Sequence, residues 1–107
     1  LVVKHIDRLN ARKEPTVVIT CVGMSNGLAG VAAARLVHPL VNCPPFKDLN
    51  DYMVNVHSSL QMPSDVPVMT VLNPKNAALC ALKILGGNDP KIREKIAQRI
   101  AKVKAEY

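Results

Sequence analysis

A glycine-containing segment between a β-branched run and an alanine-rich run constrains the fold more than any other part of this sequence. The run V-V-I-T at 17–20 precedes the segment, and the run V-A-A-A-R-L at 31–36 follows it. Strand, glycine turn and helix in this order are typical of an open α/β sheet, where ligands bind at the carboxyl ends of the strands. Such a turn places backbone N–H groups at a helix N-terminus, where the helix dipole favours an anion.

The residues of this turn have two interpretations. Gly23 allows a ligand to approach the backbone closely, and Ser25 or Asn26 can either cap the helix or contact that ligand. The alternative is a capped turn without any ligand, because short motifs often match by chance. The turn is not a Walker loop, since no G-K-[ST] is present, and the spacing of Gly23, Gly27 and Gly30 does not fit a dinucleotide fingerprint.

The rest of the chain alternates between apolar runs and helical patterns. Asn73 before Pro74 and Asp89 before Pro90 are typical helix starts, and two glycines at 86–87 predict the end of a helix. The order of elements predicts an α/β fold with a parallel sheet. The predicted strands cover 16–22, 40–43 and 66–72, and the predicted helices cover 1–12, 27–37, 51–60, 74–85 and 90–106.

The predicted sheet is narrow. Its first strand is apolar throughout, so we expect burial on both faces, but nothing in the sequence covers both edges of the sheet. A chain of 107 residues makes one domain at most, with a small core. We therefore expect an oligomer or a missing half. The helix at 27–36 is rich in Ala and Gly, which predicts close packing on a neighbouring chain and disruption by Ala33→Arg.

Composition and charge narrow the classes of partner. Hydrophobic residues make up 49% of the chain and aromatic residues 3%, so the core consists of Val, Ile, Leu, Ala and Met. The net charge of +6 and the pI of about 9.5 suit anionic partners such as phosphates or nucleic acid. Basic residues surround an apolar stripe on the last predicted helix, which is typical of a solvated face. Nucleic-acid binding needs a reading motif or stacking aromatics as well, so we expect no nucleic-acid partner.

The cysteines indicate a reducing environment. Cys21, Cys43 and Cys80 are odd in number, far apart and without a C-x-x-C pair, which argues against zinc ribbons and thioredoxin chemistry. We expect all three thiols to be reduced and at least partly buried. No apolar run reaches the length of a membrane span, and no secretory signal precedes the first predicted helix, so we expect a cytoplasmic protein without a membrane partner. Because the chain begins in the middle of a helical pattern, we expect it to be part of a longer one.

Four stretches at 22–28, 41–45, 57–64 and 71–79 are more specific together than any one alone. They read V-G-M-S-N-G-L, V-N-C-P-P, H-S-S-L-Q-M-P-S and V-L-N-P-K-N-A-A-L. Together they resemble the later part of phosphoribosylaminoimidazole (AIR) carboxylases of the PurE family. The resemblance is to the class II branch, which uses carbon dioxide and also occurs as a domain of the animal bifunctional purine enzyme. It covers 15–86, between a leading helix at 1–13 and a C-terminal helix at 88–107, within one partial domain over 1–107.

The resemblance implies a fold, an activity and an assembly. The fold is a three-layer α/β/α sandwich with a parallel sheet, flavodoxin-like or Rossmann-like, here lacking its N-terminal half. The activity is that of a carboxy-lyase of purine biosynthesis, which carboxylates 5-aminoimidazole ribonucleotide with CO2 and needs no cofactor, metal, biotin or nucleoside triphosphate. The partners are therefore a small ribonucleotide and CO2. The assembly is a homo-octamer with the helices after the glycine turn clustered around a four-fold axis and the sites near subunit interfaces.

The resemblance also implies the substrate-binding residues. This chain has Met24 and Gln61 where the family has Arg, which removes fixed positive charge that suits a phosphorylated substrate. It also has Asn55 where the family has Asp, and Asp65 where the family has Gly. The residues carried over from the family's motifs are Gly23, Met24, Ser25, Asn26, Gly27, Cys43, Pro44, Ser58, Ser59, Met62 and Pro63.

The catalytic residue has no counterpart in this sequence. The family's phosphate-binding S-x-S-D turn and its S-A-H-K segment, which holds the catalytic histidine, are both missing, so we expect these 107 residues alone not to catalyse. His5, His38 and His57 are not substitutes; His38 before Pro39 is instead expected to interact with a helix dipole. The alternative function is that of a non-catalytic, degenerate paralogue or assembly subunit with the same fold.

Overall fold

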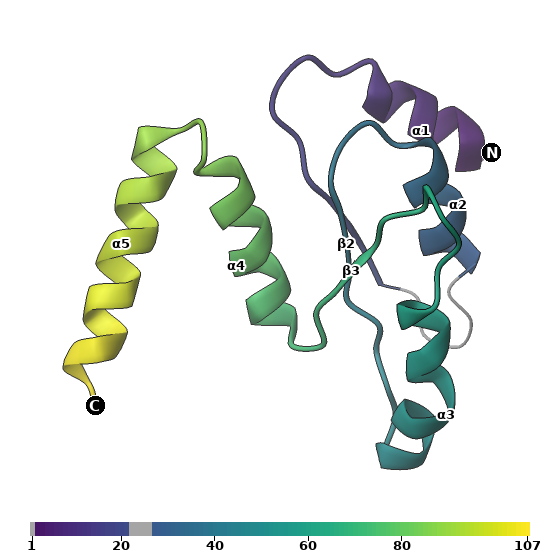
Figure 1. The fold of residues 1–107 in the computed structure, drawn as a ribbon. Coiled ribbons are helices and arrows are strands. Elements are labelled where there is room, and N and C mark those ends of the chain that lie inside the picture. The colour runs from purple at the N-terminus through teal and green to yellow at the C-terminus, as the bar shows by residue number, and fades with distance from the viewer. Residues whose placement is uncertain (1, 22–26) are drawn as a thin grey trace.

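The computed structural model describes residues 2–21 and 27–107, apart from the side chains of Val54, Asn55 and Ser58. Helices and strands alternate as the sequence predicts, with a helix at each end of the described chain (Figure 1). The elements are α1 (Val2–Asn10), β1 (Val18–Thr20), α2 (Gly27–Arg35), β2 (Leu40–Asn42), α3 (Leu49–Leu60), β3 (Met69–Thr70), α4 (Pro74–Leu85) and α5 (Pro90–Ala105).

The described strands form one parallel sheet in the order β1-β2-β3. In its register Thr20 pairs with Asn42, which in turn pairs with Thr70. The strands are shorter than the predicted 16–22, 40–43 and 66–72, although single ladder bonds continue beyond them. At the carboxyl end the Cys43 amide donates to the Thr20 carbonyl at 2.7 Å, and the Val71 amide donates to the Asn42 carbonyl at 2.9 Å. Hydrophobicity predicts which residues can form a strand, but the ladder extends only as far as a neighbour lies alongside.

Helices cover both faces of the sheet. Successive residues of a strand point to opposite faces, so Leu40 and Val41 belong to different cores. Leu40 packs with Ile6 of α1 and with Ala29 and Ala32 of α2. Val41 packs with Cys43 and with Ala77 of α4. Figure 1 shows α1, α2 and α3 on one side of the sheet, and α4 and α5 on the other. This is the predicted three-layer α/β/α arrangement.

The expected burial of the first strand on both faces is wrong. Ile19 in β1 is 42% exposed, although its neighbour Thr20 is buried. Within the described residues β1 pairs with β2 alone, so it is an edge strand. An apolar sequence therefore predicted the strand, but it did not show that one of its faces is only partly covered.

Polar side chains begin three of the helices. The Asn76 amide donates to the Asn73 side chain at 3.2 Å, and the Ile92 amide donates to the Asp89 side chain at 3.3 Å. Both caps were predicted. The helix α3 begins two residues earlier than the predicted 51 because Asp48 caps it, accepting from the Asp51 amide at 2.8 Å.

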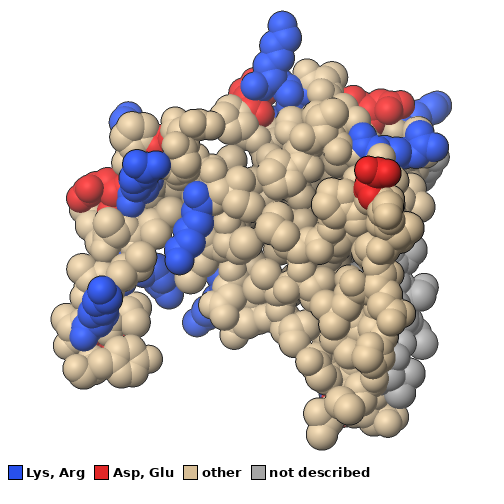
Figure 2. All heavy atoms as spheres, viewed as in Figure 1, with Lys and Arg blue, Asp and Glu red and all other residues tan. Residues whose placement is uncertain are grey.

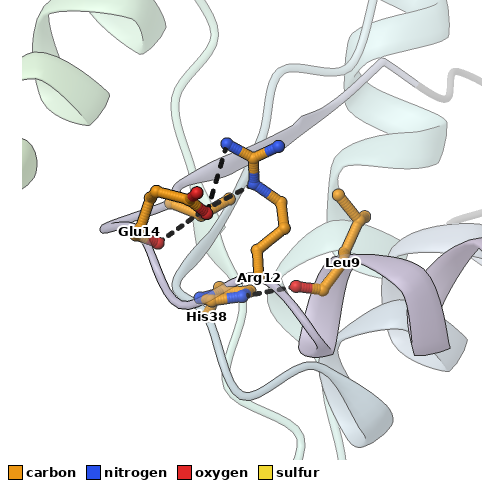
Figure 3. A network of polar contacts seen from close by, with 5 residues as sticks. Leu9, Arg12, Glu14 and His38 are labelled. Atoms are coloured by element: carbon orange, nitrogen blue, oxygen red, sulfur yellow. Dashed lines mark hydrogen bonds and ion pairs between the residues drawn. The ribbon is translucent and has the colours of Figure 1, made fainter.

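The end of α1 is joined to the end of α2 by one side chain. Asn10 donates from Nδ2 to the Arg35 carbonyl at 2.8 Å and accepts from the Val37 amide at 2.9 Å. The His38 ring donates from Nε2 to the Leu9 carbonyl at 2.7 Å (Figure 3). His38 thus contacts a helix C-terminus, as expected, but that of α1 rather than of the helix before it. This interaction gives the histidine a structural role.

The segment after α1 is held by weaker contacts. Arg12 donates from Nε to the Thr16 hydroxyl at 3.2 Å, and its guanidinium lies 3.9 Å from the Glu14 carboxylate (Figure 3). Both charged side chains are more than half exposed. An ion pair of this kind contributes little to stability, because solvent screens it.

The last helix lies apart from the sheet. α5 packs on α4, on the side away from the strands, and none of its residues is buried (Figure 1). Gly86 lets the two helices approach closely, because a Cβ atom there would lie 3.3 Å from Ile96. The Cα radius of gyration is 15.5 Å, whereas a compact domain of this length has about 13 Å. Within the described residues, no helix has the length and apolar character needed to cross a lipid bilayer.

Candidate functional site

The carboxyl ends of the strands bring several predicted site residues together. Cys43 and Pro44 follow β2 directly, and both are buried. The Cys43 thiol donates to the Leu72 carbonyl, which follows β3, over 3.6 Å. Parallel strands end at one edge of the sheet, so these residues share that edge with Cys21, the residue after β1. The C-P-P motif therefore lies where α/β sheets bind ligands.

The end of α3 and its following loop lie against the same edge. Ser59 is 3% exposed and lies beside β2 and β3. Its hydroxyl accepts from Asn42 Nδ2 at 3.5 Å, and its carbonyl accepts from the Thr70 hydroxyl at 3.3 Å. Met62 is half-buried, and a Cβ atom on Gly30 of α2 would lie 3.7 Å from its sulfur. Within this motif Ser59 thus packs against the sheet, and Met62 lies near the helix that begins at Gly27.

The structure says less about the other predicted site residues. Gly27 is the first residue of α2, and Pro63 is exposed. The Ser58 side chain and the whole of Gly23, Met24, Ser25 and Asn26 lie outside the described residues. The turn nevertheless connects two described points, since the chain leaves the carboxyl end of β1 at Cys21 and enters α2 at Gly27.

A buried polar network links the ends of all three strands, and sequence reasoning did not identify it. We call it the strand-end network and define it as Thr20, Asn42, Ser59 and Thr70. The Thr20 hydroxyl donates to Asn42 Oδ1 at 2.7 Å. Thr20, Asn42 and Ser59 are 8%, 0% and 3% exposed. The available signal was a polar residue at the end of each apolar strand, but the pairing of these residues depends on the register.

The thiols at this edge differ from each other. Burial raises the pKa of the Cys43 thiol, and the neighbouring Cys21 thiol adds a smaller effect in the same direction. Cys43 is therefore held as the neutral thiol, which is unsuited to act as a nucleophile. Cys21 is exposed, so the expectation that it is partly buried is wrong, because it follows an edge strand. Cys80 is half-buried as expected, and all three cysteines are free.

The departures from the family pattern have different consequences. Gln61, where the family has Arg, is exposed at the end of α3. Asp65, where the family has Gly, has a φ of 67°. This left-handed conformation is one that glycine adopts without strain, while Asp tolerates it better than most other residues. The loop therefore keeps the backbone shape that a glycine would allow.

The histidines and the larger hollows lie elsewhere. His5 and His57 are exposed, and His38 is held at the end of α1. No three His, Cys, Asp or Glu side chains in the described part of the chain converge as a metal site requires. A hollow of about 530 Å3 follows α4 near Cys80 and Lys83. Another, of about 450 Å3, lies at the turn from α4 to α5, and two of about 300 and 190 Å3 lie between these helices; among the described residues, no predicted site residue lines any of them.

Figure 2 shows how charge is distributed on one face of the molecule. Lys and Arg side chains are scattered over the α4–α5 side and the upper edge of this face. The middle of the face carries neither Lys and Arg nor Asp and Glu. On this face the basic residues form no continuous stripe of the kind that follows a nucleic-acid backbone.

Comparison with known proteins identifies a family that this chain resembles over nearly all of its length. The family model described as AIR carboxylase matches residues 2–106. The chain is 40% identical over 86 residues to a phosphoribosylaminoimidazole carboxylase of Archaeoglobus fulgidus, covering 80% of this chain and 47% of that protein. It is 38% identical over 90 residues to an N5-carboxyaminoimidazole ribonucleotide mutase of Pyrococcus horikoshii, covering 82% and 51%.

A solved structure agrees with these matches. The crystal structure of Treponema denticola PurE superposes with a TM-score of 0.89 at 30% identity, covering 98% of this chain and 66% of that one. The chain spans about half the length of the two curated relatives, at 47% and 51%. The similarity thus extends over nearly all of this chain but over only part of each relative.

Proposed function

This chain belongs to the AIR carboxylase family, and from that premise we propose that it forms part of an enzyme that adds CO2 to 5-aminoimidazole ribonucleotide. The observation that carries the proposal is that Cys43 and Pro44, which follow β2, and Ser59, which contacts Asn42 and Thr70, all lie at the carboxyl edge of the sheet. These residues come from separate motifs, and the fold places them at the same edge. A phosphorylated ribonucleotide also suits a chain with a net charge of +6.

The proposed reaction requires mainly that the protein hold the ribonucleotide and CO2 in position. The aminoimidazole carbon resembles that of an enamine, so its electron pair can attack CO2 and form the new C–C bond. The same carbon then loses its proton to a base, which restores the aromatic ring. Holding the two reactants together, excluding water and accepting one proton account for the catalysis. No residue among the 107 is assigned as that base.

In this proposal the edge of the sheet forms one wall of the site. Cys43 and Pro44 supply an uncharged surface at the carboxyl end of β2, and Met62 of the loop at 61–64 lies near Gly30 of α2. Backbone N–H groups of the turn at 23–27 would stabilise the developing carboxylate, as preorganised donors do in other enzymes. The chain leaves the carboxyl end of β1 at Cys21 and begins α2 at Gly27, which supports that role.

We propose a homo-octamer in the cytoplasm as the working form. Val31 of α2 is 46% exposed, and Ile100 and Val103 of α5 are 42% and 39% exposed. Exposed apolar side chains on two helices mark surfaces that another chain could cover. The post-turn helix offers such a surface through Val31, whereas Ala33 of the same helix is buried within its own chain.

The activity is tested with the complete gene product and isotopically labelled bicarbonate. We expect the label to appear in the carboxyl group of the product when 5-aminoimidazole ribonucleotide is supplied. A second arm supplies the N5-carboxylated ribonucleotide in buffer freed of CO2, because one relative is named as a mutase of that compound. Turnover in the second arm alone would replace the carboxylase proposal with a mutase.

A non-catalytic subunit is the second candidate. An Arg guanidinium donates two parallel hydrogen bonds to a phosphate group, and neither Met nor Gln carries a charge. Met24 and Gln61 in place of Arg therefore favour the non-catalytic subunit. Calorimetry distinguishes the candidates. Absence of both turnover and micromolar binding of the ribonucleotide, in a well-assembled sample, would support the non-catalytic subunit.

A further inference from the structure

The strand-end network uses polar side chains at positions where apolar ones would fit. Asn42 is completely buried in the middle strand, with the apolar residues Leu40 and Val41 immediately before it. Burying an amide requires that its hydrogen bonds be satisfied, and even then its net contribution to stability is small. The network therefore needs an explanation other than stability alone.

The two ends of the Asn42 amide face different parts of the fold. Its oxygen accepts from the Thr20 hydroxyl at 2.7 Å, and its nitrogen donates to the Ser59 hydroxyl at 3.5 Å. Thr20 is the last residue of β1 before Cys21 and the glycine turn. Ser59 lies in the last turn of α3, before the loop that contains Met62. One side chain thus connects the end of β1 with the last turn of α3.

Thr70 extends the connection to the third strand. Its hydroxyl donates to the Ser59 carbonyl at 3.3 Å, which holds the backbone of α3 against β3. The ends of β1, β2, β3 and α3 are thereby related by directional bonds as well as by packing. Hydrogen bonds of fixed geometry specify a separation between segments, whereas apolar contacts tolerate sliding.

We propose that Asn42 is a positioning residue that sets the separation between the end of β1 and the end of α3, where the loop at 61–64 begins. This inference rests on the proposed carboxylase function. Asn42 is buried and acts through Thr20 and Ser59, so it is not a catalytic residue. A shift of about 1 Å in such an arrangement can reduce the rate on the order of a hundredfold, although the mutated residue itself does not react.

The test uses Thr20→Val and Asn42→Leu in the complete protein. Thr20→Val keeps the shape of the side chain and removes the hydroxyl, while Thr20→Ser retains the donor. Leu40→Ala is the matched control, because Leu40 is buried in the same strand at its opposite end. We expect Thr20→Val and Asn42→Leu to lower kcat/KM about ten- to a hundredfold, through KM for the ribonucleotide and through kcat.

The melting temperature and kcat/KM together distinguish a positioning role of Asn42 from a role in stability alone. We expect Leu40→Ala to lower the melting temperature as much or more, yet to leave kcat/KM of the folded enzyme within about twofold, since the site is not displaced. We expect Thr20→Ser to restore most of the activity. The double variant Thr20→Val/Asn42→Leu should be no worse than Asn42→Leu, since the bond is already lost. Losses that follow the melting temperature across all variants would overturn the proposal.

Two further measurements keep the test decisive. If Asn42→Leu does not fold, Thr20→Val and Thr20→Ser carry the comparison. If the unmodified protein has no turnover, the proposed function fails, and amide hydrogen exchange then decides on the network. We expect Thr20→Val to speed exchange at Gln61, whose amide ends α3, and not at Ala11, whose amide follows α1. Unchanged exchange at Gln61 would overturn the connection.

Discussion

The middle strand and the last helix both carry large aliphatic residues, yet they differ in what they bury. Val41 of β2 is 0% exposed and packs against Ala77 of α4, while Leu40 beside it packs against α1 and α2 on the other face. α5 has an isoleucine stripe among charged residues, but none of its residues is buried, and Ile100 is 42% exposed. A strand inside a three-layer fold is covered by helices of its own chain. A terminal helix that packs on only one other helix keeps much of its surface exposed.

This difference distinguishes the elements that stabilise the single chain from those that are available for assembly. The free energy of folding comes mainly from the sheet and from the helices that cover it, because apolar burial dominates that free energy. α5 contributes less, since it contacts α4 on one side only. Its open apolar face becomes useful when another chain covers it, which agrees with the proposed octamer.

The largest expected effect comes from placing a charge in the middle strand. Val41→Asp buries an unpaired carboxylate in a closed core, which costs more than about 4 kcal/mol. We expect loss of the helical circular dichroism at every protein concentration. The matched variant Ile100→Asp places the same charge on α5, where water reaches it, so the dichroism is retained. Unfolding by both variants to the same extent would contradict the comparison.

Two arginine substitutions on α2 sharpen the comparison within one helix. Val31 is 46% exposed and Ala33 is 7% exposed, although they lie only two residues apart. Val31→Arg should leave the fold intact and dissociate the assembly, because it puts a charge on the open surface. Ala33→Arg should disrupt the fold of the single chain. The substitution expected from the sequence to test assembly therefore tests folding instead.

Sedimentation velocity with circular dichroism measures both outcomes. We expect the unmodified protein to sediment as eight chains and Val31→Arg as smaller species with an unchanged spectrum. A folded single chain of 11.6 kDa in the unmodified protein at micromolar concentration would refute the octamer. An assembled Val31→Arg would exclude this part of α2 from the interface.

Much of the fold follows from local sequence signals. The helices that begin after Asn73 and Asp89 were predicted at their first residue, because a cap acts within a single turn. The alternation of elements and the parallel sheet were also predicted. The lengths of the strands were not, because the ladder ends where the neighbouring strand diverges. The same non-local cause left Cys21 exposed and Ile19 half-covered.

The candidate site was predicted only in part. Motifs predicted Cys43, Pro44 and Ser59 as site residues, which stays a prediction, and the structure places them at one edge of the sheet. The partnership of Thr20 with Asn42 was missed, since it depends on the register of β1 against β2. A sequence shows that both residues are polar, but it does not show which residue lies opposite which.

The thiols at the sheet edge provide an intermediate effect. Cys43 is buried with a raised pKa and Cys21 is exposed, so an alkylating reagent should label Cys21 much faster in the folded protein. Mass spectrometry of labelled peptides measures the two rates. The rates in urea, where both thiols are exposed, serve as the reference. If Cys43 and Cys21 are labelled in the native state at the same rate, and as fast as in urea, the carboxyl end of β2 is open to the reagent.

The same pKa gives a dependence of stability on pH. The folded protein keeps the Cys43 proton to higher pH than the unfolded chain, whose thiols ionise near pH 8.5. The stabilising contribution is therefore complete below that pH and is lost as the pH rises above it. We expect the free energy of unfolding to fall with pH in this range, and to fall less in Cys43→Ala. An identical slope in both proteins would assign the loss to other groups.

The smallest expected effect concerns the loop that follows α3. Asp65 is held at a φ of 67°, which is unfavourable for residues with a Cβ atom. Asp65→Gly relieves this strain but increases the entropy of the unfolded chain, so we expect a net gain of no more than about 1 kcal/mol. Ser64→Gly is the control, because it brings the same entropy without any relief and should therefore destabilise. Asp65→Val should lose about 1–3 kcal/mol, since a β-branched side chain fits this conformation poorly. Urea unfolding at neutral pH measures all three, and a loss in Asp65→Gly equal to that in Ser64→Gly would show that the aspartate is not strained.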